Sequence, residues 1–109
     1  MCAEPPGQPP VFEETARGGT VVVVLRGEFD ATSEGFLSAR LERIWQSRPR
    51  RLVFVMTRVT YMDCASARLI AGAGRWLPAG VKPVISSPSP VVRRVLQLSG
   101  IGASCEFEP

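Results

Sequence analysis

The sequence predicts an α/β protein with a mixed, mostly parallel sheet of four to five strands and helices packed against it. Two observations indicate this class. Short runs of β-branched residues alternate along the chain with segments of helical periodicity. A Gly-Gly pair at residues 18–19 lies between the first two runs, which is typical of an antiparallel hairpin. Strands joined through helices run parallel instead, with right-handed crossovers. The expected order is therefore β-β-α-β-α-β-α, followed by a strand or a loop.

The length allows one domain of average size with a hydrophobic core. We assign residues 11–109 of the 109-residue chain to this domain. Residues 1–10, MCAEPPGQPP, contain four prolines and few large side chains. Such a segment does not contribute to a core, so we predict a disordered, Pro-rich tail.

Three segments in the first half predict strands. Residues 11–17 alternate loosely and precede the hairpin turn. Residues 20–26, TVVVVLR, and residues 52–56, LVFVM, are continuous apolar runs. Runs of this kind are typical of strands covered on both faces, and we expect this of both.

Residues 27–30 are expected to form a loop before the first helix. Thr32 or Ser33 caps this helix, which runs to about Ser47 and ends because Pro49 disfavours helical geometry in the preceding residue. The apolar residues of the segment fall on one helical face. They are Leu37, Leu41, Ile44 and Trp45.

A second helix is predicted over residues 64–77, with Asp63 as its N-cap. The helical period separates a buried stripe from an outer face. The inner residues are Ser66, Leu69, Ile70, Ala73 and Leu77, and the outer residues are Arg68, Gly72 and Arg75.

The C-terminal part is expected to add one weak strand, at residues 81–86, and a short helix. This helix covers residues 90–99, is capped by Ser87 or Ser89, and ends before a glycine at position 100. Residues 103–107 form a last strand or a loop.

The composition excludes several kinds of site. The chain has no His, so it forms neither a Ser-His or Cys-His nucleophile nor a His-containing zinc site. Its cysteines, Cys2, Cys64 and Cys105, are too few for a Cys₄ site and are expected to be reduced thiols. A net charge of +3 is small for a dedicated nucleic-acid binder. No nucleotide-binding glycine motif is present. We therefore expect no cofactor, no metal and no direct contact with nucleic acid.

The sequence also predicts a soluble, cytoplasmic protein. The longest apolar run, residues 21–25, is far too short to span a bilayer. No secretory signal is recognisable, because no apolar segment precedes Cys2.

Candidate functional residues gather in two loops, residues 27–33 and 57–66, each of which follows a predicted strand. In α/β proteins such loops commonly carry function. Each contains an aspartate, Asp30 and Asp63. If Asp63 caps the second helix, Ser66 lies in the first turn and is a candidate phosphate acceptor. Alternatively, Asp63 only caps and Ser66 only hydrogen-bonds locally.

Two catalytic interpretations carry less weight. Cys64, at a helix start, is a reactive thiol in one interpretation and a small buried side chain in the other, which we favour. Asp30 and Asp63 form a carboxylate pair if their loops meet, which would allow acid–base or metal chemistry. No further polar group accompanies them, so we predict no catalytic residue and no enzymatic activity.

Four segments together resemble the STAS domain family, in its anti-sigma factor antagonist branch. They are residues 27–30 (GEFD), 50–54 (RRLVF), 59–63 (VTYMD) and 87–101 (SPSPVVRRVLQLSGI). They occur in the order that the family shows, and the likeness extends over about residues 11–107.

The resemblance implies a protein that acts by binding. Family members dock on an anti-sigma factor, often a serine kinase of the histidine-kinase-like ATPase type, and so release a sigma factor for transcription. The resemblance also implies a docking surface on this chain. Its residues are Glu28, Asp30, Thr32, Asp63, Cys64, Ala65, Ser66 and Arg68. We expect a monomer or a weak homodimer, because an edge strand at residues 11–17 or near Pro83 is open to pairing.

The sequence departs from the family at the phosphorylation switch. The residue that the family phosphorylates stands two positions after the aspartate, where this chain has Ala65, and Ser66 replaces a usual glycine. Val55 replaces an aspartate that is common in the preceding strand. Neighbouring helical residues point about 100° apart, so one kinase does not easily serve both positions. The chain is then either unphosphorylated or switched at Ser66. As an alternative function, it is a non-phosphorylated subunit of a larger assembly, such as a transporter-associated complex.

Overall fold

The computed structural model describes residues 8–109, apart from the side chains of residues 100 and 101. The predicted disordered tail falls mostly on residues 1–7, which lie outside the described residues, as does Cys2. Residues 8–10 lie within the described part of the chain, and Gln8 and Pro9 pass beside the end of the second strand. The backbone N–H of Glu28 donates to the carbonyl of Gln8 at 3.3 Å.

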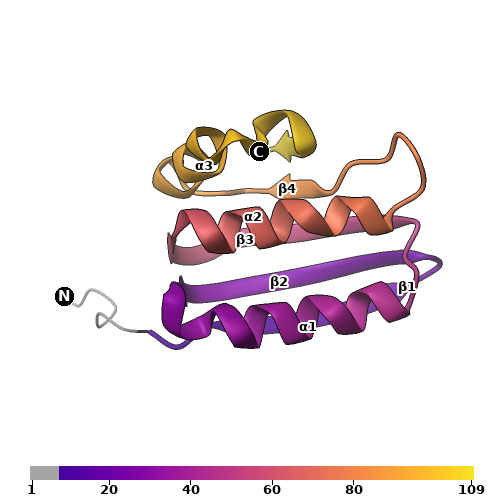
Figure 1. Ribbon diagram of the computed structural model, residues 1–109, viewed down its shortest axis with the longest axis horizontal. Helices are drawn as coiled ribbons and strands as arrows, with labels where there is room; N and C mark the ends of the chain where they lie inside the picture. The colour runs from indigo at the N-terminus through magenta and orange to yellow at the C-terminus, as the bar shows by residue number, and fades with distance from the viewer. Residues whose placement is uncertain (1–7) are drawn as a thin grey trace.

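Five strands form one sheet in the order β1-β2-β3-β4-β5 (Figure 1). They are β1 (Val11–Arg17), β2 (Thr20–Phe29), β3 (Arg51–Met62), β4 (Val84–Ser86) and β5 (Glu106–Glu108). Strands β1 and β2 are antiparallel and all later pairs are parallel. This confirms the mixed, mostly parallel sheet and the hairpin. The C-terminal segment, left open as a strand or a loop over residues 103–107, contains a strand that begins at Glu106.

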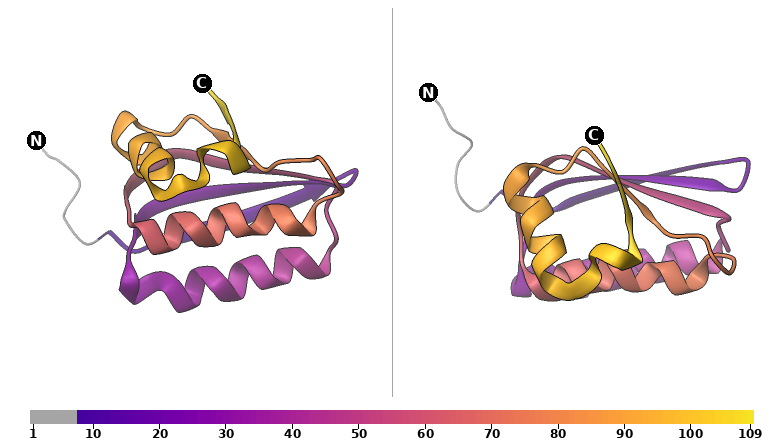
Figure 2. Two further views of the ribbon diagram at one scale, coloured as in Figure 1. Left: turned by 45° about the horizontal axis from the view of Figure 1, so that its top comes forward. Right: turned by 90° about the horizontal axis from the view of Figure 1, so that it is seen from above.

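Helical segments connect the parallel strands. They are α1 (Glu34–Gln46), α2 (Cys64–Gly72) with a 3₁₀ turn (Ala73–Trp76), and α3 (Pro90–Leu96) with a π-helical turn (Gln97–Ile101). Helices α1 and α2 lie side by side on one face of the sheet, and α3 lies beside α2 on that same face (Figure 2). No helix within residues 8–109 is long and apolar enough to cross a membrane.

The prediction that β2 and β3 are covered on both faces is wrong. Burial alternates along both strands, and Val22 and Val24 on β2 and Val53 and Val55 on β3 are only half-buried. The physical reason is the strand order. From β2 to β5 each strand adds to the same edge of the sheet, so every right-handed crossover places its helix on the same face.

The core lies between that face and the helices. Its largest fully buried side chains come from β2, β3, β4 and all three helices. They are Phe29, Phe54, Leu25, Leu37, Ile44, Leu52, Met56, Met62, Ile70, Ile85, Leu96 and Val23.

Both long strands extend beyond their predicted ends. Residues 27–29 continue β2 instead of forming a loop, and β3 continues to Met62. A register shift between Gly27 and Glu28 keeps β2 paired with β3. Gly27 has a φ of +88°, and the carbonyl oxygen of Pro9 occupies the space where a β-carbon would lie. Only glycine fits this position without a backbone shift.

Predicted helix limits also need correction. The first helical segment begins with a 3₁₀ turn (Ala31–Ser33) that the Asp30 side chain caps, and Ser33 stands at the N-cap position of α1 without making a side-chain capping bond. On its predicted inner face three residues are buried, but Trp45 is 50% exposed. Trp45 lies one position past the buried Ile44, so the helical turn carries it to the margin of the apolar stripe. In the second helix the α-helical part stops at Gly72 and the rest is a 3₁₀ turn.

The C-terminal segment differs in similar ways. Ser89, not Ser87, caps α3, and its hydroxyl accepts from a backbone N–H of that helix at 3.2 Å. Ser87 has a φ of +56° and donates its N–H to the carbonyl of Glu108. The helical path continues through Gly100 as a π-helical turn instead of ending before it.

The sheet edges are β1 and β5. The expected exposed edge near Pro83 is therefore wrong, because β5 pairs with β4 and the Glu106 N–H donates to the carbonyl of Pro83 at 2.9 Å. The other expected edge, residues 11–17, is confirmed as an edge strand.

Candidate functional site

The two predicted loops meet at the carboxyl ends of the neighbouring central strands β2 and β3. Strands β2 and β3 are parallel and end together, with Phe29 opposite Met62. The backbone N–H of Asp63 donates to the carbonyl of Phe29 at 3.0 Å. Asp30 and Asp63 therefore leave the sheet at neighbouring positions, and each begins the helical segment that follows its strand.

Asp30 is held as a charged helix cap. Its Oδ1 accepts from the hydroxyl of Thr32 at 2.6 Å and from the backbone N–H of Thr32 at 3.0 Å. The hydroxyl of Ser33 accepts from the backbone N–H of Asp30 at 3.0 Å, which completes a reciprocal cap. The pKa of Asp30 lies below its ordinary value, chiefly because the Thr32 hydroxyl bonds the carboxylate. Asp30 thus presents an ionised carboxylate just beyond the end of β2.

Asp63 caps α2, as predicted. Its Oδ1 accepts from the backbone N–H of Ser66 at 2.8 Å. The next residue, Cys64, is exposed, so the interpretation of Cys64 as a small buried side chain is wrong. Ala65 is half-buried. The first turn of α2 therefore presents a thiol and a methyl group to a partner, but no hydroxyl.

Ser66 faces the core. It is 0% exposed, and its hydroxyl has no hydrogen-bond partner among the described residues. A kinase needs an exposed hydroxyl to transfer phosphate. In this conformation Ser66 would become accessible only if the first turn of α2 opened.

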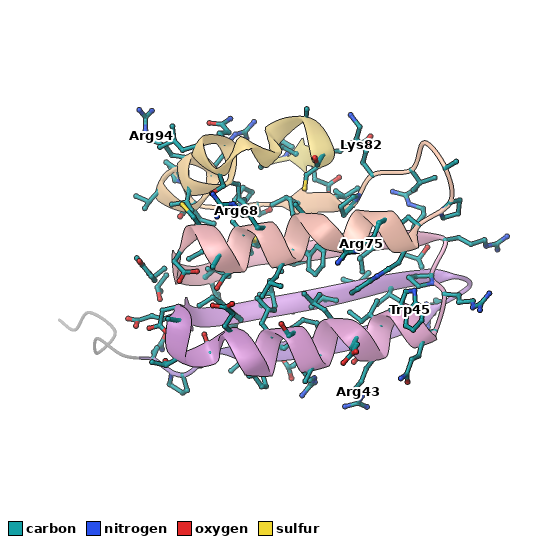
Figure 3. All side chains as sticks on the ribbon, viewed as in Figure 1. Arg43, Trp45, Arg68, Arg75, Lys82 and Arg94 are labelled. Atoms are coloured by element: carbon teal, nitrogen blue, oxygen red, sulfur yellow. The ribbon has the colours of Figure 1, made fainter. Side chains whose placement is uncertain are left out.

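The remaining predicted docking residues lie around the two caps. Glu28 is half-buried at the end of β2, and Thr32 is exposed beside Asp30. Arg68 is exposed on α2, in the part of the helix nearer its start (Figure 3). Seven of the eight predicted residues have at least part of their surface accessible at the ends of β2 and β3 or on the first turns that follow, and Ser66 is the exception.

Sequence reasoning missed Tyr61. This side chain is 47% exposed, directly opposite Glu28 at the end of β3. The signal was present in the sequence, because strand side chains alternate between faces and the neighbouring Met62 is apolar and inward. An exposed aromatic ring at the end of a strand is suited to binding a protein partner.

The same arrangement offers little to chemistry. Asp30 and Asp63 each use one carboxylate oxygen to accept from backbone N–H groups. Within residues 8–109 there is no group of three or more His, Cys, Asp or Glu that could hold a metal ion. The other described cysteine, Cys105, is buried, and burial raises its pKa to about 11. The site is best described as a surface for binding.

Comparisons with known proteins agree with this description. The family model named STAS domain matches residues 12–109. An anti-sigma F factor antagonist of Lysinibacillus sphaericus is 31% identical over 85 residues, which cover 76% of this chain and 73% of that protein.

Solved structures of similar proteins share the fold. The anti-sigma factor antagonist SpoIIAA, in its unphosphorylated form, superposes with a TM-score of 0.74 at 27% identity, covering 91% of this chain and 89% of that one. An anti-sigma factor antagonist from Mycobacterium paratuberculosis gives a TM-score of 0.79 at 20% identity, with 93% and 86% covered. The second likeness concerns the fold alone.

Proposed function

Because the chain belongs to the STAS domain family, we propose that it acts as an anti-sigma factor antagonist, a regulatory protein that works by binding. One observation supports this most directly. Asp30 and Asp63, the two aspartates carried by the family-like segments, lie at neighbouring strand ends and begin two adjacent helices. The partner is then an anti-sigma factor, and binding it releases a sigma factor.

We further propose that docking uses one continuous surface. Its members are Glu28, Asp30, Thr32, Tyr61, Asp63, Cys64, Ala65 and Arg68, and we call it the docking surface. The two capping carboxylates make its centre acidic, so a basic patch on the partner would be attracted and oriented. A serine kinase of the histidine-kinase-like ATPase type is the partner class that the family suggests.

Phosphorylation of Ser66 is not part of this proposal. Ala65 has no hydroxyl, and the hydroxyl of Ser66 is fully buried. A phosphate with nearly two negative charges does not fit a buried position among apolar side chains. We therefore propose that the complex is controlled by something other than a phosphate on α2, such as the amount of either protein.

Calorimetric titration with the cognate anti-sigma factor tests the function. Asp30→Arg places a positive charge where the surface is acidic and removes a cap, so we expect affinity to fall at least about 30-fold, or about 2 kcal/mol. Glu14→Arg is the matched control, because Glu14 is an exposed carboxylate on the edge strand β1. It should leave the affinity unchanged.

Two results would contradict the proposal. One is equal binding by the native chain and by Asp30→Arg, with both folded by circular dichroism. The other is phosphorylation of Ser66. If mass spectrometry located a phosphate on Ser66 after the complex was incubated with Mg-ATP, the proposal that the complex is not controlled by phosphorylation of α2 would be refuted. Ser66→Glu is unsuitable as a mimic of phosphoserine, because it would place a charged side chain at a buried position.

A further inference from the structure

A hollow surface lies at the opposite end of α1 and α2 from the docking surface. Two adjoining hollows, of about 430 and 440 Å³, share Trp45, Arg75 and Trp76. We call this region, together with Arg48 and Arg50, the tryptophan groove. Figure 3 shows Trp45 and Arg75 at the same end of the helix pair. The chain has only two tryptophans, and both line this groove.

The groove has the composition of a protein-binding surface. Leu41 and Leu69 line it between the two helices. Trp45 is 50% exposed, and Trp76 is half-buried beside it. Tryptophan and arginine are the residue types that most often dominate binding energy when a partner covers them. When a partner buries a large aromatic ring that is half exposed, the apolar area removed from water contributes strongly to the binding energy.

The charge of the groove decides which partner fits. Arg48, Arg50 and Arg75 line it, against a single carboxylate, Glu42. Among residues 8–109 none of these arginines forms an ion pair. Three positive charges beside two indole rings are complementary to a segment that is acidic and bears an apolar side chain.

We propose that the tryptophan groove binds an acidic segment of another protein, anchored by an aromatic or branched apolar side chain against Trp45 and Trp76. The site is separate from the docking surface. Helix α1 has 13 residues and is about 20 Å long, with Asp30 ahead of its start and Trp45 in its last turn. They also differ in charge, so they select different partners, and both can be occupied at once. The inference does not depend on the anti-sigma function.

Intrinsic tryptophan fluorescence provides the test, because both emitting rings lie in the groove. The probes are peptides selected on the full chain from a displayed library of random peptides of about 15 residues, a length of about four helical turns. Selected peptides are titrated into the native chain and into Trp45→Ala and Arg75→Glu. Arg43→Glu is the matched control, because Arg43 is exposed on α1 and extends away from α2 (Figure 3).

We expect the selected peptides to be net acidic and to contain an aromatic residue or leucine. Their binding should shift the emission to shorter wavelength and weaken with salt. Affinity should fall at least about tenfold in Trp45→Ala and Arg75→Glu, remain unchanged in Arg43→Glu, and remain unchanged in Asp30→Arg. The last variant separates this proposal from the proposed function.

Three results would overturn the inference. The first is a selection that yields no binding peptide, or only neutral or basic ones. The second is binding that both groove variants preserve. The third is an emission shift that depends on the concentration of the chain itself, which would place a second copy in the groove. Thermal unfolding of each variant confirms that a lost signal is not a lost fold.

Discussion

The two ends of the α1–α2 layer differ in how their charged side chains are held. At the starting end, Asp30 and Asp63 accept hydrogen bonds from backbone N–H groups. At the other end, Arg75 makes no ion pair among the described residues, and Trp45 is half exposed. Polar groups at the first end therefore stabilise the helix starts as well as forming the proposed docking surface, whereas the arginine side chains of the proposed groove have no such structural bond among the described residues.

The cysteines should show the largest contrast. The experiment uses a Cys2→Ser chain, so that only Cys64 and Cys105 can react. Cys64 is exposed and follows the Asp63 cap, whereas burial raises the pKa of Cys105 from 9.0 to about 11. At neutral pH this raised pKa lowers the thiolate fraction of Cys105 about a hundredfold relative to a thiol of the ordinary pKa. Burial slows the reaction of Cys105 further, because the reagent cannot easily reach its sulfur. We expect Cys64 to react with a thiol reagent at least about a hundred times faster, as measured by absorbance and peptide mapping.

The anti-sigma factor should protect Cys64 from the thiol reagent and leave the reaction of Cys105 unaffected.

The raised pKa of Cys105 also has a consequence for the stability of the fold. The unfolded chain ionises Cys105 from about pH 9, before the folded chain does near pH 11, so its contribution to stability is complete below pH 9 and is lost above it. Equal reaction rates of the two thiols would contradict the distinction between the exposed Cys64 and the buried Cys105.

Substitution at each end should separate folding from binding. Asp63→Ala removes the acceptor for the Ser66 N–H, so the free energy of unfolding should fall by about 1–2 kcal/mol. Arg75→Glu removes no hydrogen bond to residues 8–109 and should change that energy by less than about 0.5 kcal/mol. Urea unfolding measures both.

Asp63→Asn is the control, because an amide oxygen can still accept at the cap. It should recover most of the lost stability. If Arg75→Glu destabilised the chain as much as Asp63→Ala, the arginine would have a structural role and the contrast between the two ends would not hold.

The smallest effect concerns the charge of Asp30. Thr32→Val removes the hydroxyl that chiefly lowers the pKa of Asp30, so this pKa should rise toward 3.8. The stabilisation of the ionised cap is present above pH 3.8 and is lost as the pH falls through the lowered value. An NMR titration of the carboxyl carbon measures the change, and a pKa that does not move would assign the shift to the backbone N–H groups instead.

Local signals in the sequence predicted much of the fold and the two loops that carry the candidate site. Asp63 was identifiable as a cap because a short acceptor before a helical segment satisfies a free N–H group wherever the helix lies. The order of strands and helices followed from hydrophobic period and from a Gly-Gly turn. The resemblance to the STAS family added the docking residues, and the structure brings Asp30 and Asp63 together as the two-loop argument required.

Other features depend on contacts between segments that are distant in the sequence. The valine runs of β2 and β3 read as doubly buried, but the one-sided winding of the crossovers leaves Val22 and Val53 half exposed. Likewise, Gly27 is required because Pro9 passes over it. A pattern of apolar residues reports hydrophobicity, and it does not report on which side a helix arrives.

The sequence by itself determined the element order, the capping aspartate Asp63 and the absence of a hydroxyl at Ala65, because each depends on one residue and its immediate neighbours. Only the tertiary structure decided that Cys64 is exposed, that Val22 and Val53 are half-buried and that Trp45 and Trp76 share one groove. Exposure is a property of what packs against a side chain, and for these residues the packing partners lie on other elements.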